Sequence, residues 1–303
     1  MNAKRKLLVT GAHGFVAGSV LVQAGDEWEL HALSRGGEAK ARRDWRWHAV
    51  DPLDAAALER VFIAVRPDAV VHTAAIADID FCQANQALAR SVNVEMTRTL
   101  AELCGHGRAR LVFCSTDTVF DGEHAPYREE DSPGPVNFYA ETKVEAEQCV
   151  GGLGAQGIIA RLALVVGLPL WGAGNSFLMR VVTALKAGKT VSTAAEEVRT
   201  PIDVITLGRA LLELAGGGQS GVFHLAGLTR VNRLQMNQTI AARFGFPLHL
   251  LAAQPPAERS GRAPRPRDVS LQCAKAGAQL KTPLRTFDEG LSLILERGNT
   301  SAA

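Results

Sequence analysis

The chain has 303 residues, of which 47% are hydrophobic and 21% charged, a composition typical of a globular protein with a sizeable core. Its 33 basic and 31 acidic side chains leave a net charge of +2, which argues against nucleic acid and membrane surfaces as partners. Five scattered cysteines without a CxxC pair, eight histidines without ligand spacing and no apolar run of about 18 residues predict a cytoplasmic protein with reduced thiols, no metal and no membrane span.

The first half of the chain alternates short apolar runs with helical patterns. Apolar runs predict strands at residues 7–10, 29–33, 47–50, 69–72, 110–114 and 157–166. Apolar residues at helical spacing predict helices at residues 16–24, 55–65, 87–103 and 140–150. Strands that alternate with helices indicate a parallel sheet with helices on both faces. We therefore expect an α/β fold, a Rossmann-type doubly wound parallel sheet, over residues 1–167.

The alternation loosens after residue 167. Helices are predicted at residues 177–187, 204–214, 232–244 and 287–297, with a short strand at residues 221–225. We expect a smaller C-terminal α/β substrate lobe over residues 168–303. An alternative is that strand 221–227 and parts of 200–216 return to the first domain.

A glycine-rich turn, "VTGAHGFVAGSV", follows the first predicted strand and opens the first predicted helix. Its glycines permit a tight turn close to a pyrophosphate, which the N–H groups of the helix can bind. The usual third glycine is displaced, because Ala17 stands in its place and Gly18 follows. The context predicts a dinucleotide site, with a structural turn as the alternative. The loop residues expected at the cofactor are Gly11, His13, Gly14, Phe15 and Val16.

The ends of the second and third predicted strands bear on the choice of cofactor. Folds that bind NAD usually place an acid after the second strand, where this chain has Ser34 and Arg35. Arginine can bind a 2′-phosphate, so the sequence favours NADP(H), with NAD(H) as the alternative. After the third strand, Asp51 can accept a bond from adenine while Leu53 packs on the ring. A turn-capping role for Asp51 is the alternative.

Two further motifs, "STDTVFDG" and "YAETK", carry candidate catalytic groups. Tyr139 and Lys143 are four residues apart and share one face of a predicted helix. A neighbouring ammonium lowers the pKa of a phenol, which would suit Tyr139 to proton transfer. Thr116 ends the fifth predicted strand, and ligands bind at the carboxyl ends of parallel strands. We therefore expect Thr116 and Tyr139 to hold a carbonyl oxygen while nicotinamide delivers hydride, with an exposed helical pair as the alternative.

Several segments in order resemble the extended short-chain dehydrogenases/reductases, and most of all the dTDP-4-dehydrorhamnose reductase family. They include "TGAHGFVAG", "VVHTAAIADIDFC", "STDTVFDG", "NFYAETKVEAE", "GVFHLAG" and "RPRDVSL". The resemblance implies that Thr116, Tyr139 and Lys143 form the catalytic triad. Tyr139 would be the proton donor, and Lys143 would hold the nicotinamide ribose. It also implies a sugar-nucleotide substrate and a homodimer formed through the helices at residues 87–103 and 140–150.

The same resemblance assigns further residues to the site. Beneath the cofactor it places Ala74, Ala75 and Ile76, with the helix residue Asn93 nearby. On the substrate side the expected residues are Asp117, Thr118, Leu164, Asn175 and Arg265. Packing within loops is the alternative for Asn175 and Arg265.

The chain departs from the family pattern in its expected substrate pocket. Thr118 replaces the tyrosine of "STDYVFDG", and in "RLALVVG" Leu164 and Val166 replace a tryptophan and a tyrosine. Loss of these rings removes stacking and polar contacts together, which changes the ligand. We expect an NADP(H)-dependent carbonyl reductase that acts on a non-rhamnose sugar nucleotide or another biosynthetic ketone. The alternatives are a sugar-nucleotide epimerase or dehydratase, and a non-catalytic nucleotide-binding regulatory subunit.

Overall fold

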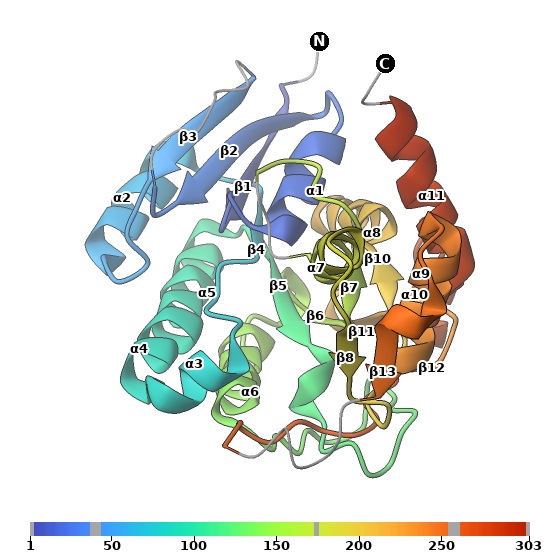
Figure 1. The fold of residues 1–303 in the computed structure, drawn as a ribbon. Helices are drawn as coiled ribbons and strands as arrows, with labels where there is room; N and C mark the ends of the chain where they lie inside the picture. Colours follow the sequence, from blue (N-terminus) through green and yellow to red (C-terminus); the bar gives the residue numbers. More distant parts are fainter. Residues whose placement is uncertain (1–2, 37–43, 173–175, 254–260, 301–303) are drawn as a thin grey trace.

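The computed structural model describes residues 3–36, 44–172, 176–253 and 261–300. Seven strands form one parallel sheet in the order β11-β6-β5-β4-β1-β2-β3 (Figure 1). The chain runs outward in one direction from β1 and in the other from β4, so the strand order reverses between these two strands. This arrangement confirms the predicted α/β fold. The strands are β1 (Arg5–Thr10), β2 (Trp28–Ser34), β3 (Trp45–Ala49), β4 (Ala69–His72), β5 (Arg110–Thr116), β6 (Gly157–Leu162) and β11 (Gly221–Leu225).

Helices cover both faces of the sheet. Successive strand residues point to opposite faces, so Leu7 and Val9 of β1 pack in one apolar cluster and Leu8 packs in another. The first cluster also contains side chains of α1 (Phe15–Gln23) and α8 (Val204–Gly216). The second contains side chains of α2 (Ala55–Val65), α5 (Met96–Gly107) and α6 (Phe138–Gly151). Strand β11 and helix α8 therefore belong to the layers of the main sheet, although both come from the C-terminal half.

The predicted helix at residues 87–103 is longer and less regular in the structure. It comprises α4 (Gln86–Arg90), a π-helical turn η1 (Ser91–Glu95) and α5, and a short helix α3 (Ile79–Ala84) precedes it. A π turn inserts an extra residue into the helix and is frequent at functional sites. The sequence pattern does not reveal the π turn, because its apolar spacing differs little from that of an α-helix.

The predicted strand at residues 157–166 is too long. Strand β6 ends at Leu162, where its pairing with β5 and β11 also ends. The apolar run continues as the short strand β7 (Val165–Val166), which pairs with β10 (Ile202–Asp203). Val166 packs in a third apolar cluster with the C-terminal helices, so the run stays apolar after it leaves the sheet.

The C-terminal helices and short strand pairs lie beside the main sheet (Figure 1). Antiparallel β9 and β12 form one pair, and parallel β8 and β13 form another. The segment that precedes α10 lies against the loop that follows β5 and against β9, because Tyr127 bridges to Leu271 and Val198 bridges to Asp268. The elements are α7 (Phe177–Lys186), β8 (Val191–Thr193), β9 (Val198–Arg199), β12 (Val231–Asn232), α9 (Arg233–Phe244), β13 (Leu251–Ala253), α10 (Ala274–Gln279) and α11 (Phe287–Thr300).

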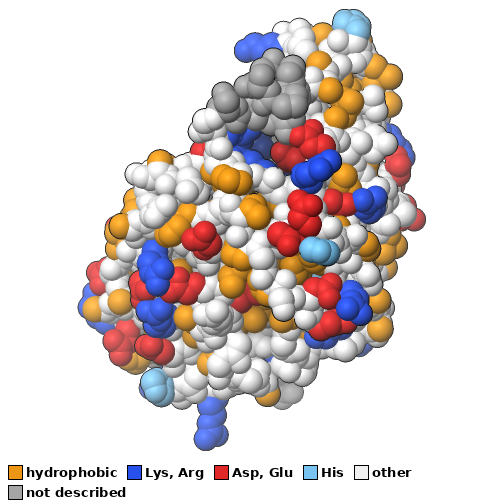
Figure 2. Space-filling model, turned by 90° about the horizontal axis from the view of Figure 1, so that it is seen from below, with side chains coloured by type: hydrophobic (Ala, Val, Ile, Leu, Met, Phe, Trp, Pro, Cys, Tyr) orange, Lys and Arg blue, Asp and Glu red, His pale blue; other side chains and the backbone are white. Residues whose placement is uncertain are grey.

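The surface agrees with the small net charge. Figure 2 shows acidic and basic side chains lying next to one another on the face seen from below the view of Figure 1. Within the described ranges, every helix is too short or too polar to cross a membrane.

Candidate active site

The carboxyl end of β5 and the first turn of α6 form the centre of the candidate site. Thr116 is the last residue of β5, and its Oγ1 accepts the N–H of Thr118 at 3.2 Å, which starts the short 3-10 turn η2 (Asp117–Val119). Helix α6 begins at Phe138 because the side-chain oxygen of Asn137 accepts the N–H of Ala140 at 3.0 Å. These two caps set the residues at which η2 and α6 begin.

Asn137 is a buried residue of the candidate site that was not predicted from the sequence. Its side chain also donates to the carbonyl oxygen of Pro264 at 3.0 Å, and it is almost fully buried. It therefore joins the first turn of α6 to the segment at residues 264–268. An asparagine just before a helical pattern is a recognisable start signal and could have identified it.

Hydroxyl groups gather at the end of β5. Thr116 Oγ1 lies 3.0 Å from Thr118 Oγ1 and donates to Asp117 Oδ1 at 3.3 Å. Tyr139, in the first turn of α6, lies beside Thr116, whose hydroxyl acts to lower the pKa of the phenol. Thr116, Asp117 and Thr118 are all buried, so their side chains are shielded from bulk water. The structure thus brings Thr116 and Tyr139 together, as the sequence predicts.

The ionisation of Tyr139 differs from the prediction. We expected the ammonium of Lys143 to lower the pKa of the phenol. Burial instead raises the pKa of Tyr139, and the nearby carboxylate of Asp117 raises it further. The Thr116 hydroxyl opposes this rise in pKa, and Lys143 is not among the principal influences. Tyr139 is therefore a protonated hydrogen-bond donor at neutral pH.

Lys143 lies one helical turn beyond Tyr139, and its side chain reaches β5. Its Nζ donates to the carbonyl oxygen of Cys114 at 2.6 Å and lies 4.1 Å from the centre of the Phe113 ring. Burial lowers the pKa of Lys143 to about 8, against the opposing influence of Cys114 and Glu147. An ammonium has three donors, so two protons remain for other acceptors.

The glycine loop fits a pyrophosphate. Gly11 adopts φ +68°, and a Cβ there would lie 2.9 Å from Cα of Ala74, so only glycine lets the turn approach this closely. Gly14 precedes α1 and provides no side-chain cap. The first N–H groups of α1 can therefore bind an anion. Phe15 packs in the third apolar cluster, so only its backbone is available to a cofactor.

The remaining loop residues, His13 and Val16, are partly buried. The ring of His13 packs against the ring of Trp47, and the two ring centres lie 4.8 Å apart. His13 therefore lies between the glycine loop and β3, on the side of the sheet where the adenosine half of a dinucleotide is expected.

The ends of β2 and β3 are held by local hydrogen bonds. Ser34 donates its hydroxyl to the carbonyl oxygen of Gly36 at 2.8 Å, so its single proton is committed to this turn. Arg35 is exposed at the end of β2. Asp51 Oδ1 accepts the N–H of Leu53 at 2.9 Å, which is the turn-capping alternative, and Leu53 is 56% exposed.

Asn93 lies between the segment beneath the expected cofactor site and α6. Its Oδ1 accepts the N–H of Ile76 at 2.8 Å, and its Nδ2 donates to the Ile76 carbonyl and to Thr142 Oγ1. Both amide protons are in use, and the residue is buried in the π turn. Asn93 therefore fixes the segment that contains Ala74 and Ala75 against α6.

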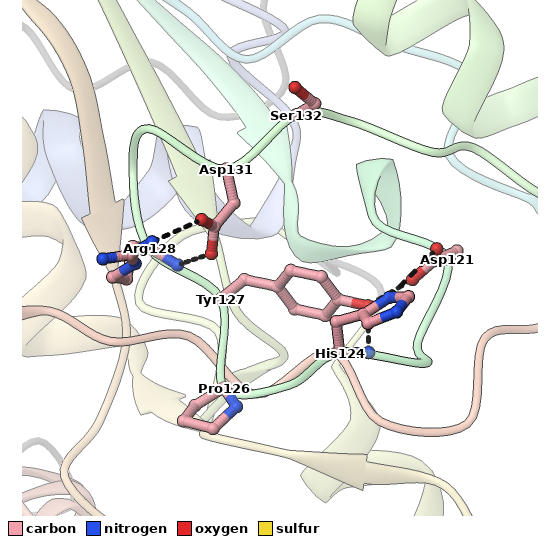
Figure 3. A pocket seen from close by; sticks show the side chains of 7 residues that line it. All are labelled: Asp121, His124, Pro126, Tyr127, Arg128, Asp131 and Ser132. Atoms are coloured by element: carbon pink, nitrogen blue, oxygen red, sulfur yellow. Dashed lines mark hydrogen bonds and ion pairs between the residues drawn. The ribbon is translucent and has the colours of Figure 1, made fainter.

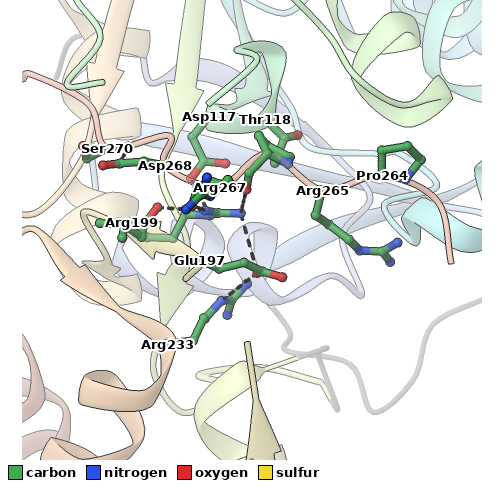
Figure 4. Close-up of polar contacts among 12 residues, drawn as sticks. Asp117, Thr118, Glu197, Arg199, Arg233, Pro264, Arg265, Arg267, Asp268 and Ser270 are labelled. Carbon is green, nitrogen blue, oxygen red and sulfur yellow. Dashed lines mark hydrogen bonds and ion pairs between the residues drawn. The ribbon is translucent and has the colours of Figure 1, made fainter. Parts of the chain in front are cut away.

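The expected substrate residues separate into two groups. Asp117 and Thr118 lie with the hydroxyl groups described above. Leu164 is partly buried and packs against the third apolar cluster. Arg265 binds both carboxylate oxygens of Asp80, at 2.7 and 2.8 Å, and Figure 4 shows it extending away from Asp117. Its guanidinium thus holds α3, which was the loop-packing alternative, and Asn175 lies outside the described residues.

A chain of buried and partly buried charges next to Asp117 was not predicted from the sequence (Figure 4). Arg199 Nε lies 3.6 Å from Asp117 Oδ2, and Arg199 Nη2 lies 3.7 Å from Glu197 Oε2. Glu197 also pairs with Arg233 at 3.5 Å. These residues are far from Asp117 in the sequence and belong to no local motif, so no sequence signal joins them.

A separate pocket lies on the loop between η2 and α6 (Figure 3). The hydroxyl of Tyr127 accepts the N–H groups of Gly122, Glu123 and His124 and donates to Asp121. This bonding shapes the loop, and the pocket wall contains none of the candidate catalytic residues. The wall is formed by Asp121, His124, Pro126, Tyr127, Arg128, Asp131 and Ser132.

The chain is similar to known proteins over nearly its whole length. The family model described as RmlD substrate binding domain matches residues 5–300. The dTDP-4-dehydrorhamnose reductase of Mycobacterium tuberculosis is 31% identical over 307 residues, covering 96% of this chain and 92% of that protein. Methionine adenosyltransferase 2 subunit beta of Bos taurus is 30% identical over 291 residues, covering 93% and 85%.

A solved structure shares the fold. The crystal structure of dTDP-4-dehydrorhamnose reductase from Bacillus anthracis, in complex with NADP, matches with a TM-score of 0.86 at 21% identity. The match covers 97% of this chain and 100% of that chain. It therefore includes both the main sheet and the C-terminal elements beside it.

Proposed function

Because the chain belongs to the RmlD substrate binding domain family, within the extended short-chain dehydrogenases/reductases, we propose that it is an oxidoreductase that reduces a carbonyl group with NADP(H). One observation carries the proposal. The hydroxyl groups of Thr116 and Tyr139 meet at the carboxyl end of β5, with Lys143 one turn further along α6. Parallel α/β sheets bind their ligands at this edge.

The proposed mechanism assigns one task to each side chain. A bound nicotinamide dinucleotide supplies the hydride that reaches the carbonyl carbon. Tyr139 donates its proton to the carbonyl oxygen as negative charge develops there, which its protonated state permits. Thr116, beside Tyr139 at the end of β5, faces the same carbonyl oxygen. Lys143 uses its remaining N–H groups to bind a ribose hydroxyl, and Asn93 keeps α6 in register with the segment beneath the cofactor.

NADP(H) is the proposed cofactor in preference to NAD(H). Arg35 is exposed at the end of β2, where a guanidinium can pair with a 2′-phosphate. Ser34 binds its own turn and leaves this contact to Arg35. The related structure from Bacillus anthracis was solved with NADP, which agrees with this preference.

The proposed substrate is a sugar nucleotide with a keto group, or a related biosynthetic ketone. The similarity to dTDP-4-dehydrorhamnose reductases supports a sugar nucleotide. Thr118 and Leu164 occupy the positions where that family carries aromatic rings. We therefore expect the sugar to differ from the rhamnose precursor.

The test is NADPH consumption with a panel of ketones and 4-keto sugar nucleotides. Oxidation of NADPH with one member of the panel supports a reductase. A redox-neutral product with the cofactor retained would make the chain an epimerase instead.

The 30% identity with methionine adenosyltransferase 2 subunit beta makes a regulatory subunit the second candidate. The two candidates differ in one measurement. A regulatory subunit would bind NADPH, measured by its fluorescence, without turnover of any substrate in the panel. Binding followed by oxidation would exclude a purely regulatory role.

We also propose that the chain forms a homodimer through α4, α5 and α6. The proposal depends on the family resemblance, and the 40% exposure of Leu88 on α4 agrees with a covered surface there. Light scattering after size exclusion should give twice the mass of 32.3 kDa. A Leu88→Glu variant should elute as a monomer. A wild-type mass of 32.3 kDa would refute the dimer.

A further inference from the structure

The segment at residues 262–268, here called the strap, joins the C-terminal elements to α3 and α6. Figure 1 shows it in orange-red along the lower edge of the molecule. It contains Pro264 and Pro266, which have no N–H group to donate to a neighbouring strand. Side chains of other elements hold much of the strap in place, and their contacts show what it does.

Asp80 of α3 binds one end of the strap through both carboxylate oxygens. Oδ1 accepts hydrogen bonds from Arg265 Nη1 at 2.7 Å and from the N–H of Ala263 at 3.0 Å. Oδ2 accepts from Arg265 Nη2 at 2.8 Å and from Arg262 Nε at 3.2 Å. The hydrogen-bonded Arg265 guanidinium holds the pKa of Asp80 well below its usual range, so the carboxylate is charged at neutral pH. An isolated surface ion pair contributes little, but a two-pronged contact within a network fixes geometry.

Strand β9 binds the other end of the strap. The N–H of Val198 donates to the carbonyl oxygen of Arg267 at 2.7 Å. The buried guanidinium of Arg199 donates to the same oxygen at 3.3 Å and to the Pro266 carbonyl at 3.4 Å. Arg199 also lies 3.6 Å from Asp117, so this end of the strap lies beside the candidate site (Figure 4). The strap thus extends from β9 to α3.

The middle of the strap contacts the start of α6. The carbonyl oxygen of Pro264 accepts the side-chain N–H of Asn137 at 3.0 Å, and Asn137 also caps the helix. Helix α3 reaches the same turn directly, because Gln83 Oε1 accepts the N–H of Phe138 at 3.1 Å. Tyr139 is the next residue. Helix α3, the strap and the first turn of α6 therefore form a closed ring of contacts that includes the turn of Tyr139.

The position of the strap and the start of α6 depend on each other. Asp80 binds the residues on either side of Pro264, so it fixes where the Pro264 carbonyl lies. Asn137 is 2% exposed, so its amide would lose a partner inside the protein if that carbonyl moved away. A displacement of the strap is therefore transmitted to the cap of the helix that carries Tyr139.

We propose that Asp80 is a positioning residue: by holding the strap against Asn137, it sets the place of Tyr139 at the start of α6. The same contacts tie α3 to β9, so they also hold the C-terminal elements against the main sheet beside the candidate site. The task of Tyr139 as proton donor rests on the proposed function. The coupling between Asp80 and the start of α6 does not.

Hydrogen–deuterium exchange measured by mass spectrometry tests the coupling without substrate or cofactor. Asp80→Asn removes the charge and one of the two acceptor oxygens that bind Arg265. The amide hydrogens of residues 262–268 and of residues 137–141 should both exchange at least about 10-fold faster. Peptides from β1, which lies outside the ring of contacts, should keep their wild-type rates. Arg265→Gln removes the other half of the pair and should give the same pattern.

Asp288→Asn is the matched control. Asp288 also lies in the first turn of a helix, α11, and pairs with an arginine from another segment, Arg243, at 3.0 Å. This variant should leave the exchange of residues 137–141 at the wild-type rate. With substrate present, Asp80→Asn should lower kcat by about 10-fold or more, as expected for a misplaced proton donor. KM for NADPH should not change, because the glycine loop lies outside the ring of contacts.

Faster exchange in the strap alone, with residues 137–141 unchanged, would overturn the proposal. Equal acceleration in β1 would also overturn it, because the effect would then be a general loss of stability. If Asp80→Asn does not fold, Arg265→Gln provides the same comparison. An unchanged kcat despite faster exchange at residues 137–141 would exclude a role in positioning Tyr139. Coupled exchange in a protein that oxidises no NADPH would contradict the proposed reductase and leave the coupling in place.

Discussion

The ammonium of Lys143 donates a 2.6 Å hydrogen bond to the carbonyl oxygen of Cys114, on the strand that ends in Thr116. The bond holds the buried ammonium against β5, next to the candidate active site. Burial lowers the pKa of Lys143 to about 8. The position of the charge is thus fixed before any ligand binds. Its presence depends on pH, because the ammonium is lost as the pH rises through about 8.

Lys143→Met should lower kcat/KM for carbonyl reduction by about 100-fold or more, as expected for loss of a group in the proton-transfer site. NADPH affinity should fall as well, measured by fluorescence titration. Lys275→Met is the matched control, since Lys275 donates to the Val222 carbonyl at 2.5 Å and lies 4.2 Å from the Phe223 ring centre. Equal losses in both variants would indicate a purely structural role.

Arg35→Ala should raise KM for NADPH by about 10- to 100-fold, the value of a charge-assisted bond of about 1.5–3 kcal/mol. KM for NADH should change little, because NADH has no 2′-phosphate. Arg46→Ala on the neighbouring strand removes another exposed arginine and should leave KM for NADPH and KM for NADH unchanged. An unchanged preference in Arg35→Ala would contradict the assignment of NADP(H) to this residue.

Glu147 and Arg161 form a buried ion pair beneath the site, with a shortest contact of 2.8 Å between Glu147 Oε2 and Arg161 Nη2. Glu147→Gln should destabilise the fold by about 3–5 kcal/mol in denaturant unfolding, because it leaves a buried guanidinium unpaired. The double variant Glu147→Met, Arg161→Met should recover most of this loss. A single variant as stable as the wild type would show that water reaches the pair.

His72 should make the fold sensitive to acid. Its ring bonds to Thr10 at 2.7 Å and Thr97 at 3.0 Å, and burial lowers its pKa to about 3, with the Lys143 charge adding to the effect. The unfolded chain takes up a proton below about pH 6.5 while the folded chain does not, so stability is lost as the pH falls from about 6.5 toward 3. The slope should be about 1.4 kcal/mol per pH unit, and smaller in His72→Gln, in denaturant unfolding at several pH values. If the wild type and His72→Gln show the same slope, the loss of stability at low pH comes from other groups.

Local patterns predicted much of the fold. Apolar runs and helical spacing identified the first strands and helices, because each element buries one face or both in the sheet layers. The break after Leu162 was missed, since Val165 and Val166 remain apolar when they leave the sheet. The π turn around Asn93 was missed because one extra residue barely alters the apolar spacing.

The candidate site could be predicted only in part. Thr116 ends β5 and Tyr139 lies in the first turn of α6, two positions that the local patterns identify. The partners of Arg265 and Asp117 lie far away in the sequence, so their ion pairs follow from the tertiary fold alone. The raised pKa of Tyr139 likewise follows from tertiary packing, because burial causes most of the rise and Asp117 adds to it.

The measurement that tests the central claim most directly is transfer of deuterium from NADPH labelled at its hydride-donating carbon to a 4-keto sugar nucleotide, followed by mass spectrometry. The account predicts one deuterium on the former carbonyl carbon with the wild type. It predicts a loss of about 100-fold or more in rate with Tyr139→Phe, while NADPH binding is retained. Deuterium transfer by Tyr139→Phe at the wild-type rate would contradict the assignment of the proton donor. No transfer to any member of the panel by the wild type, despite NADPH binding, would contradict the reductase itself.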